Sequence, residues 1–332
     1  MKISICIPTF NRAPELAQLL DSIAAQRGHG LDVEVVISDN ASTDGTDALV
    51  EQRSAALSIV YRRQPTNVGF DRNLLSAVAI ASGEFCWLFG SDDILEAGAL
   101  RSLEELLLTH PSLGGMSVGS QGYSADLEAR RFVRDNVSSQ FNADVVLIGR
   151  DAVAGAIGPW LGYMSGLIVK STAWNRVVEE MDVSPFFSGY VHLYVVLAML
   201  GPTTRWLASP RRLVGCRLDN ESFGTGDEFA RTRLDLVEFE RVFRATLGGR
   251  SPVFHHVQQM VAGFFIRGHF MNAKRVGVSA RYWRQAIPAA FRSYGHYRLF
   301  WTTLLPVMAT PRPALLFARR LYGALRARRD SH

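Results

Sequence analysis

The first 110 residues alternate between short apolar runs and longer segments with helical character. The apolar runs have the length and composition of buried strands, and they lie at 3–7, 33–37, 58–62 and 84–89. The segments between them repeat apolar residues every three to four positions or open with helix-capping residues, and they cover 14–26, 43–54, 70–81 and 96–109. This alternation predicts an α/β fold, in which a mostly parallel sheet is flanked by helices on both faces.

Residues 111–225 are less regular, and residues 226–332 are mostly helical. Short apolar runs separated by glycine, proline and serine turns fall at 115–118, 145–148, 167–169, 205–207 and 213–217. We interpret them as strands that extend the same sheet. In the helical tail, interruptions are expected at Pro288, Pro306, Pro311 and Pro313. The predicted division is therefore 1–110 and 111–225 as two halves of one domain, and 226–332 as a C-terminal helical extension.

The basic residues of the chain are concentrated at its C-terminal end. The net charge is +5, but residues 267–332 carry 13 lysines and arginines against one acid, so the remaining residues are net negative by 7. A segregated basic end points to an anionic partner. Its arginines alternate with large apolar side chains such as Phe300, Trp301 and Leu315, which favours a membrane surface over nucleic acid.

Composition excludes several other classes of protein. With 48% hydrophobic and 20% charged residues, the chain has the composition of a folded globular protein. Its three cysteines, Cys6, Cys86 and Cys216, are too few and too scattered for a disulfide framework or a zinc cluster. The first apolar run is too short for a signal peptide, and no apolar run reaches about 18 residues. We therefore expect a reduced, cytoplasmic setting and no membrane-spanning helix.

Polar residues that can bind phosphate or a cation follow the predicted strands at their carboxyl ends. In a parallel sheet these four loops share one edge, where the ligands of such sheets bind. They offer carboxylates for a divalent cation and a guanidinium for a phosphate. The candidate residues are Pro8, Thr9, Asn11 and Arg12 after the first strand, Asp39 after the second, Asn67, Gly69 and Arg72 after the third, and Ser91, Asp92 and Asp93 after the fourth.

Four short motifs at these strand ends resemble those of glycosyltransferase family 2. They are SICIPTFNR at 4–12, ISDNASTDGT at 37–46, NVGFDRN at 67–73 and FGSDD at 89–93, in the order and spacing of that family. The family uses nucleotide-sugar donors on an A-type glycosyltransferase fold, so the resemblance implies that fold and that chemistry. The variants SDN and GSDD look more like abequosyltransferase-type members of O-antigen assembly than like cellulose-synthase-type members.

For the donor, the resemblance implies a contact for each matching residue. The nucleoside pocket would be lined by Thr9 and Asn11, and Pro8 and Arg12 beside them would also contact the nucleotide-sugar. Asp39 would accept a hydrogen bond from the base. A ring N–H at N3 favours uracil or thymine, whereas cytosine offers an exocyclic amine instead, so a CDP donor is disfavoured but not excluded. Arg72 would meet the phosphates, and further contacts to the nucleotide-sugar would come from Asn67, Gly69, Ser91 and Asp92.

The FGSDD motif implies a divalent cation, Mn²⁺ or Mg²⁺, as cofactor. The resemblance assigns it to Asp92 and Asp93, and it makes Asp93 a catalytic residue. Such a cation neutralises the charge that develops on the departing nucleoside diphosphate. Two positions depart from the family, because Gly90 and Ser38 stand where it often has an aspartate. These departures can alter metal affinity and the contact to the ribose.

The general base is less well defined by the sequence. An inverting transfer needs a group that takes the proton of the acceptor hydroxyl. The family commonly supplies an acid near the start of a helix in the second half, but the corresponding stretch 186–194 contains no carboxylate. His192 is the nearest general base, and a packed histidine in an apolar helix is the other interpretation of this residue. Glu180 and Asp182, just upstream, are alternatives.

These observations lead to one main function and one alternative. The main function is metal-assisted, inverting transfer of a sugar from a nucleotide-sugar to a glycan or polyprenyl-linked acceptor in surface polysaccharide assembly. The alternative is a catalytically inactive protein that binds nucleotide-sugar or acts as a scaffold. We expect residues 283–328 to dock on the inner face of the cytoplasmic membrane without crossing it, because their apolar stretches are short against the roughly 20 residues that a span needs. Packing on the protein's own body or on a dimer partner is the other interpretation.

Overall fold

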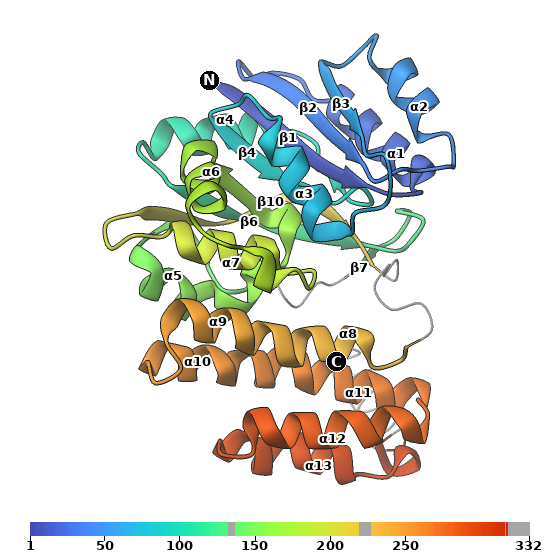
Figure 1. Ribbon diagram of the computed structural model, residues 1–332, viewed down its shortest axis with the longest axis vertical. Coiled ribbons are helices and arrows are strands. Elements are labelled where there is room, and N and C mark those ends of the chain that lie inside the picture. The colour runs from blue at the N-terminus through green and yellow to red at the C-terminus, as the bar shows by residue number, and fades with distance from the viewer. Residues whose placement is uncertain (132–136, 219–226, 316, 318–332) are drawn as a thin grey trace, which may run out of the picture. The chain divides into compact units, whose positions relative to one another are not determined.

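The computed structural model describes residues 1–131, 137–218, 227–315 and 317. The chain separates into two compact units, Met1–Glu221 and Ser222–His332. The first unit is a sheet covered by helices, and the second unit is helical (Figure 1). The expected boundary between residues 225 and 226 lies outside the described residues.

Four parallel strands form the N-terminal half of the sheet, in the order β3-β2-β1-β4. They are β1 (Lys2–Thr9), β2 (Asp32–Asp39), β3 (Ile59–Arg63) and β4 (Phe85–Leu88). The helices that connect them are α1 (Ala13–Ala24), α2 (Thr46–Arg53) and α3 (Phe70–Ala79). Nearly every residue of β1 and β4 is buried, as expected of central strands with both faces covered.

The second half continues the same sheet with parallel and antiparallel pairs. β9 (Leu167–Lys170) lies between β4 and β6 (Gly115–Tyr123) and is antiparallel to both, whereas β10 (Arg205–Arg217) runs parallel to β6. Short antiparallel strands extend it, namely β5 (Ile94–Leu95), β7 (Arg130–Arg131) and β8 (Val145–Ile148). The helices of this half are α4 (Ala99–Thr109), α5 (Gly149–Ile157), α6 (Ser171–Glu180) and α7 (Val191–Met199). Because the longest ladders are parallel, the sheet is mostly parallel, as the sequence predicts.

Two of the predicted apolar runs form a single strand. The segments 205–207 and 213–217 both belong to β10, whose register against β6 shifts between Ser209 and Val214. Pro210 lies in this stretch and has no backbone N–H to donate to a ladder. The irregularity therefore lets the strand continue past the proline, as a β-bulge does.

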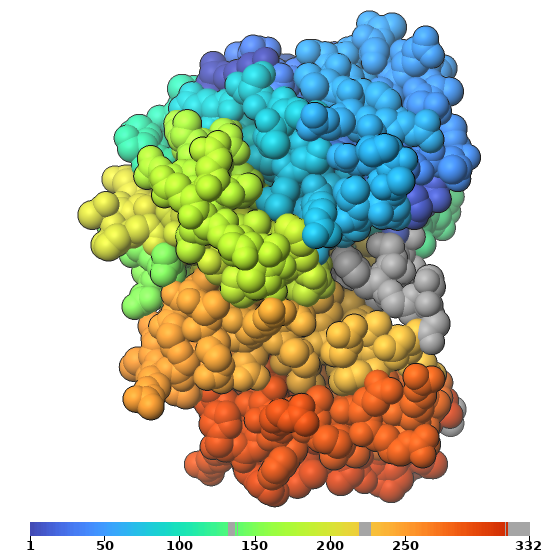
Figure 2. Space-filling view, viewed as in Figure 1, coloured from blue at the N-terminus to red at the C-terminus, as the bar shows by residue number. Residues whose placement is uncertain are grey.

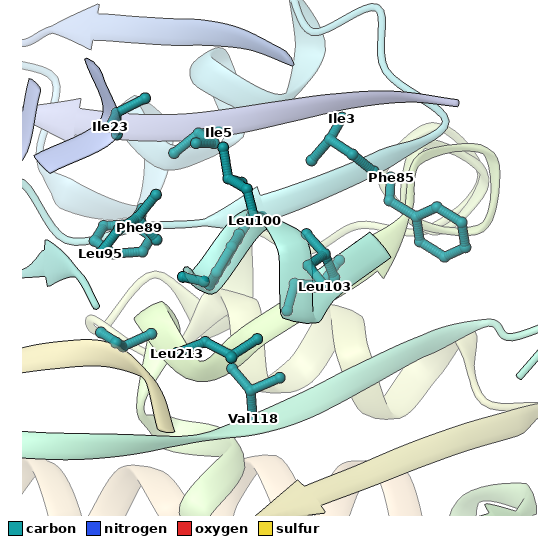
Figure 3. Close-up of a cluster of buried hydrophobic side chains, with 14 of the residues drawn as sticks. Ile3, Ile5, Ile23, Phe85, Phe89, Leu95, Leu100, Leu103, Val118 and Leu213 are labelled. Atoms are coloured by element: carbon teal, nitrogen blue, oxygen red, sulfur yellow. The ribbon is translucent and has the colours of Figure 1, made fainter. Parts of the chain in front are cut away.

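The main core of the first unit joins the sheet to α1 and α4. Figure 3 shows Ile5 of β1, Ile23 of α1, and Leu100 and Leu103 of α4 within one cluster of buried side chains. The apolar stripe of α4 faces this cluster, so burial of that stripe stabilises the helix. This packing fixes the strands whose ends carry the candidate residues.

The second unit consists of helices that are joined by π-helical turns. α8 (Ala230–Arg233) leads through Leu234–Glu238 into α9 (Phe239–Leu247), and α10 (Pro252–Met260) leads through Val261–Ile266 into α11 (Arg267–Val276). α12 (Ala280–Tyr294) follows, and Phe300–Leu304 leads into α13 (Leu305–Ala309). In the described part of the chain, no helix has both the length and the apolar character that crossing a membrane requires.

Pro288 does not interrupt the helical tail, contrary to the sequence-based expectation. It lies in the interior of α12. The missing N–H removes one helical hydrogen bond. Ala286 and Ala290, two residues away on either side, are fully buried. Tertiary packing therefore holds the helix together across the proline, because packing contributes more to helix stability than local propensity does.

Candidate active site

The four strand-end loops meet at the carboxyl edge of β1, β2, β3 and β4. Side chains of each loop bond to the next, so the loops form one connected surface. The contacts that join them are Asn11 N–H to Ser42 Oγ (2.9 Å), Asn40 Nδ2 to Asn67 Oδ1 (2.8 Å) and Arg12 Nη1 to Asp92 Oδ2 (2.7 Å). The prediction that these loops share one edge of the sheet is confirmed.

The end of β1 places three candidate residues at this edge. Pro8 and Thr9 are buried opposite the last two residues of β2. The Thr9 hydroxyl is buried and has no hydrogen-bond partner in the structure, which is rare for a buried polar group. Asn11 has a φ of 48°, a left-handed conformation that asparagine tolerates better than most residues. Its sharp turn directs the chain from β1 into α1.

Asp39 is fully buried, and both of its carboxylate oxygens accept hydrogen bonds. Oδ1 accepts from the Ser42 N–H at 2.9 Å, and Oδ2 accepts from the Tyr61 hydroxyl at 2.8 Å. Arg63 Nε lies 3.7 Å from Oδ2. Burial and then the charge of Asp39 raise the pKa of Tyr61, so the phenol remains a donor. Asp39 therefore holds the loop after β2 in place, and its contact with a nucleobase stays a prediction.

Ser38 belongs to a buried hydrogen-bond network that suits a small neutral side chain. Its hydroxyl donates to Asn73 Oδ1 at 2.7 Å and accepts from Gln64 Nε2 at 3.2 Å. Asn73 Nδ2 donates in turn to the backbone carbonyl of Ser38 at 2.8 Å. An aspartate at position 38 would bring a negative charge next to the Asn73 carbonyl oxygen. The residues around position 38 thus suit serine better than the aspartate that the family often has there.

Asp92 is the candidate carboxylate that reaches the surface of the site. Its side chain is 26% exposed, that of its ion-pair partner Arg12 is 16% exposed, and Ser91 beside it is buried. Partial burial strengthens an ion pair, because less water screens the two charges. Arg12 therefore orients Asp92 at the edge of the sheet and brings a positive charge there.

Asp93 is buried, and its carboxylate accepts three hydrogen bonds. Oδ2 accepts from the Tyr163 hydroxyl at 2.7 Å and from Ser165 Oγ at 2.6 Å, and Oδ1 accepts from the Arg217 N–H at 3.0 Å. Burial, and then the charge of Asp92, raise the pKa of Asp93 to about 7, although these hydrogen bonds oppose the shift. Asp93 thereby ties the loop after β4 to the turn at 163–165 and to the end of β10.

Arg217, the last residue of β10, anchors the same loop. Its Nε donates to the backbone carbonyl of Asp92 at 2.9 Å. Its two terminal nitrogens donate to the carbonyl of Ala125 and to Gln18 Oε1. The guanidinium thus joins the loop after β4 to α1 and to the residues that follow β6.

Gly90 fits a space that leaves little room for a side chain. Its N–H donates to Ser165 Oγ at 2.9 Å. A Cβ at this position would lie 3.1 Å from Asp92 Oδ1 and 3.2 Å from Ser165 Oγ, closer than most Cβ contacts in proteins. The volume that the family's aspartate would need is therefore occupied by the groups that hold Asp92 and Asp93.

The two adjacent aspartates differ in their fitness to bind a metal. Within the described ranges, no group of three or more His, Cys, Asp or Glu side chains could hold a metal ion. Mg²⁺ at phosphate sites commonly uses only one or two carboxylates, and phosphate oxygens and water complete its shell. The partly exposed Asp92 fits such a site. The buried Asp93 already accepts three hydrogen bonds, and its role as the second ligand stays a prediction.

The loop after β3 places a guanidinium at the start of α3. Gly69 has a φ of 84°, which favours glycine, and its N–H donates to Asn67 Oδ1 at 2.9 Å. Arg72 follows in the first turn of α3 and is exposed. Its guanidinium lies 4.7 Å from the centre of the Phe187 ring. An exposed guanidinium in the first turn of a helix is well suited to bind a phosphate.

His192 is buried in the first turn of α7. It is 2% exposed, and its Nε2 lies 3.1 Å from the carbonyl oxygen of Gly162. Burial lowers the pKa of His192 to about 4, so the ring stays neutral. Its Nδ1 is buried without a hydrogen-bond partner. A weakly basic ring with this little exposure favours the packing interpretation over the role of general base. Glu180 and Asp182 are exposed at the end of α6 and beyond it.

Two residues of this site received no role from the sequence. Arg217 closes a predicted strand, and a charged residue at a strand end was the only available signal. Asp71 lies inside the NVGFDRN motif, but its carboxylate contacts Gly189 and Val191, some 120 positions later in the chain. Contacts over such distances leave no local pattern, so the sequence alone could not find them.

Comparison with known proteins agrees with this geometry. Residues 4–147 match glycosyl transferase family 2. The chain is 34% identical over 251 residues to the abequosyltransferase RfbV of Salmonella typhimurium strain LT2, an alignment that covers 72% of this chain and 73% of the relative.

Solved structures share the fold. The S. aureus TarS 1–349 structure in complex with UDP-GlcNAc superposes with a TM-score of 0.58 at 18% identity, over 96% of this chain and 88% of that one. The mannosyltransferase PcManGT from Pyrobaculum calidifontis, in complex with GDP-Man and Mn²⁺, has a TM-score of 0.54 at 19% identity, over 92% of this chain and 84% of that one. Together with the strand-end loops, these likenesses show that the chain is a glycosyltransferase with an A-type fold and belongs to glycosyltransferase family 2.

Proposed function

We propose that the protein transfers a sugar from a nucleotide-sugar donor to a glycan or polyprenyl-linked acceptor, with inversion, in surface polysaccharide assembly. The observation that carries this proposal is the connected edge of four strand-end loops, where the Arg12–Asp92 pair joins the loop after β1 to the loop after β4. The relationship to an abequosyltransferase supports a role in surface glycans. The likeness to TarS with bound UDP-GlcNAc supports a nucleotide-sugar donor.

On the donor side, we assign the contacts to residues of the strand-end loops. The Thr9 hydroxyl and the Asn11 turn line the nucleoside end, with Pro8 and Arg12 beside them. Asp39 holds the loop that closes over the base. Arg72, with Asn67 and Gly69 shaping the turn before it, binds the phosphates, and its positive charge stabilises the nucleoside diphosphate as it departs.

The residues present fit one divalent cation, Mn²⁺ or Mg²⁺, held by Asp92. When bound, such a cation supplies Lewis-acid stabilisation of the leaving diphosphate. Arg12 orients the Asp92 carboxylate, and Ser91 and Asp93 shape the loop around it. The relative PcManGT is described with Mn²⁺, which supports this choice of cofactor.

For the acceptor, the proposal retains a general base in the second half of the domain. His192 is the base that the sequence predicts, but its burial and its lowered pKa favour a packing role, so the base is sought elsewhere in this half. A base that acts on the acceptor hydroxyl must lie within hydrogen-bond reach of it. In His192 the nitrogen that could take this proton is Nδ1, because Nε2 contacts the Gly162 carbonyl.

A second function is favoured by specific observations. A protein that binds nucleotide-sugar without turning it over would not need a strong metal site or a general base. Asp93 is engaged by three hydrogen bonds, and residues 186–194 contain no carboxylate. Against this alternative stand the exposed Arg72 and the oriented Asp92.

One experiment separates the two functions. The full chain is incubated with UDP-, dTDP-, GDP- and CDP-sugars, and release of the nucleoside diphosphate is measured with Mn²⁺ and with chelator. Our proposal expects slow hydrolysis of at least one donor with Mn²⁺ and none with chelator. Binding of a nucleotide-sugar without release under either condition, and without transfer to added polyprenyl-linked glycans, would favour the inactive protein.

The second unit supports a peripheral location on the inner face of the cytoplasmic membrane. Of the predicted docking region 283–328, residues 283–315 and 317 are described. One side of α12 exposes Arg284, Ile287, Phe291 and Arg292, and the 52%-exposed Trp301 lies next to Phe291 with ring centres 6.1 Å apart. Residues 267–317 contain eight basic residues and no acid. Exposed aromatic groups among arginines suit an anionic lipid surface.

Sedimentation with liposomes that contain phosphatidylglycerol tests this location. The chain with both Phe291→Ser and Trp301→Ser should lose at least about tenfold in binding, because each apolar side chain removed from the lipid costs about 1.5–3 kcal/mol. Leu108→Ser is the matched control, since Leu108 is 72% exposed on α4 of the first unit. Equal binding of both variants, or no binding of the unaltered chain at low salt, would contradict the proposal.

A further inference from the structure

The start of α3 and the start of α7 are joined by two neighbouring residues. Asp71 and Arg72 are adjacent in the first turn of α3, and both contact the segment 187–191 that leads into α7. Figure 2 shows the side chains around residue 70, in light blue, next to those around residue 190, in yellow-green, on one face of the first unit. We call this pair of contacts the α3–α7 latch.

The first part of the latch is an ionic cap supplied by another helix. Asp71 Oδ2 accepts from the Gly189 N–H at 2.8 Å, and Oδ1 accepts from the Val191 N–H at 3.1 Å. The first N–H groups of a helix have no partner within the helix, and a carboxylate is favourable there. Tyr190 stands at the N-cap of α7 and its side chain makes no capping hydrogen bond. Asp71 therefore takes over a task that a local serine or asparagine usually performs.

Burial opposes the negative charge of Asp71 at this position, while the two N–H groups favour it. Asp71 is 8% exposed, and burial raises its pKa, although the two N–H groups and Arg72 oppose that shift. If capping were the only task, a neutral side chain within the segment 187–191 would suffice. The position of Asp71, directly before the phosphate-binding Arg72, indicates that it connects two parts of the site.

The second part of the latch involves the side chain of Arg72 itself. The guanidinium lies 4.7 Å from the centre of the Phe187 ring, a cation–π arrangement. Gly189, two residues later, has a φ of 101°, a left-handed conformation that favours glycine. Arg72 thus contacts Phe187, while Asp71 holds the backbone that leads into α7.

We propose that Asp71 is a positioning residue, which couples binding of the donor diphosphate at Arg72 to the placement of residues 187–193 on the acceptor side. The inference rests on the proposed function, because it takes Arg72 as the phosphate contact. It predicts that diphosphate binding orders the start of α7, and that this response is lost when Asp71 can no longer hold both N–H groups.

The test compares Asp71→Asn with a matched control, Asp151→Asn. Asp151 is an exposed acid in the first turn of α5 in the same unit. UDP, dTDP, GDP and CDP, each with Mn²⁺, serve as probes; calorimetry measures their affinity and mass spectrometry measures amide exchange over 187–193. In the unaltered chain and in the control, we expect the nucleoside diphosphate that binds to slow amide exchange over 187–193. In Asp71→Asn it should not slow this exchange, although its affinity for the variant should stay within about threefold of that for the unaltered chain. Its kcat for donor turnover should fall by about tenfold or more at a nearly unchanged KM, because small displacements of positioned groups cost that much.

Each other outcome overturns a defined part of the account. Asp71→Asn with the unaltered kcat and with exchange that still slows on binding would overturn the latch. A probe that binds without slowing exchange in the unaltered chain would overturn the coupling and leave the proposed function standing. No binding of any probe would reject the proposed function. If Asp71→Asn does not fold, Phe187→Leu keeps the cap and removes the ring; it should weaken the exchange response, and an unchanged response would overturn the coupling.

Discussion

Glu34 gives the sharpest stability prediction, because a single buried carboxylate holds together the end of the sheet opposite the site. It lies on β2 next to Ser4 of β1 and is 3% exposed. Its oxygens accept hydrogen bonds from Ser4 Oγ at 2.5 Å and from the N–H and the hydroxyl of Ser82 at 2.6 and 2.7 Å. Lys2 Nζ lies 2.8 Å away. Burial alone would raise the pKa of Glu34, but these four partners lower it to about 2.

The expected magnitude follows from this shift. The ordinary pKa of 4.5 falls to about 2 in the folded chain, and at about 1.4 kcal/mol per unit this amounts to about 3–4 kcal/mol. Because Lys2 is 38% exposed, water screens the contribution of its ion pair with Glu34. We therefore expect Glu34 to contribute about 2 kcal/mol to the free energy of unfolding. The folded pKa is the lower one, so this stability is present above about pH 4.5 and is lost as the pH falls toward 2.

The perturbation is Glu34→Gln, measured by urea unfolding at about pH 7, 5 and 3.5. At pH 7 the variant should lose about 2 kcal/mol, because glutamine has no charge and turns an N–H₂ group toward other donors. The difference from the unaltered chain should shrink at pH 3.5. Glu51→Gln, on the exposed side of α2, is the control. If the two variants are equally stable at pH 7, or if the loss at Glu34 does not depend on pH, the reasoning is refuted.

Two further predictions concern the site. Gly90→Ala places a Cβ 3.1 Å from Asp92 Oδ1 and 3.2 Å from Ser165 Oγ. We therefore expect a stability loss of about 1–3 kcal/mol in thermal melting and a slower release of the nucleoside diphosphate. Unchanged values in both assays would contradict this packing. His192 is buried and its pKa is lowered to about 4, so its neutral form stabilises the fold above about pH 6.5 and this contribution is lost as the pH falls toward 4. In His192→Asn the melting temperature should therefore decline less between pH 6.5 and 4. The acid limb of the pH–rate profile should remain in this variant. Loss of that limb together with about a thousandfold fall in kcat would identify His192 as the general base.

The positions of the strand-end loops could be predicted because they follow from chain order. Alternating strands and helices require parallel strands, and parallel strands bring their carboxyl ends to one edge. Thr9, Asp39 and Asp92 were located from this rule and from the family resemblance. The partners that define their chemistry could not be found in this way.

Asp93 shows why the remainder of the site needed the structure. Its hydrogen-bond donors, Tyr163, Ser165 and Arg217, lie 70 to 124 positions later in the chain. The motif predicts Asp93 as a metal ligand, and only the structure shows that its buried carboxylate also anchors the loop through three donors. Pro288 is a similar case, because a proline predicts a helix break unless tertiary packing spans it.

The most direct test of the central claim is calorimetric titration of the full chain with UDP, dTDP, GDP and CDP, with and without Mn²⁺. The unaltered chain should bind at least one nucleoside diphosphate, and Mn²⁺ should tighten that binding by about tenfold or more, in line with the charge that a divalent cation neutralises. Asp92→Asn should remove the effect of Mn²⁺, whereas Asp93→Asn should keep part of it. Binding that is absent for every nucleotide, or an effect of Mn²⁺ that survives in Asp92→Asn, would contradict the account.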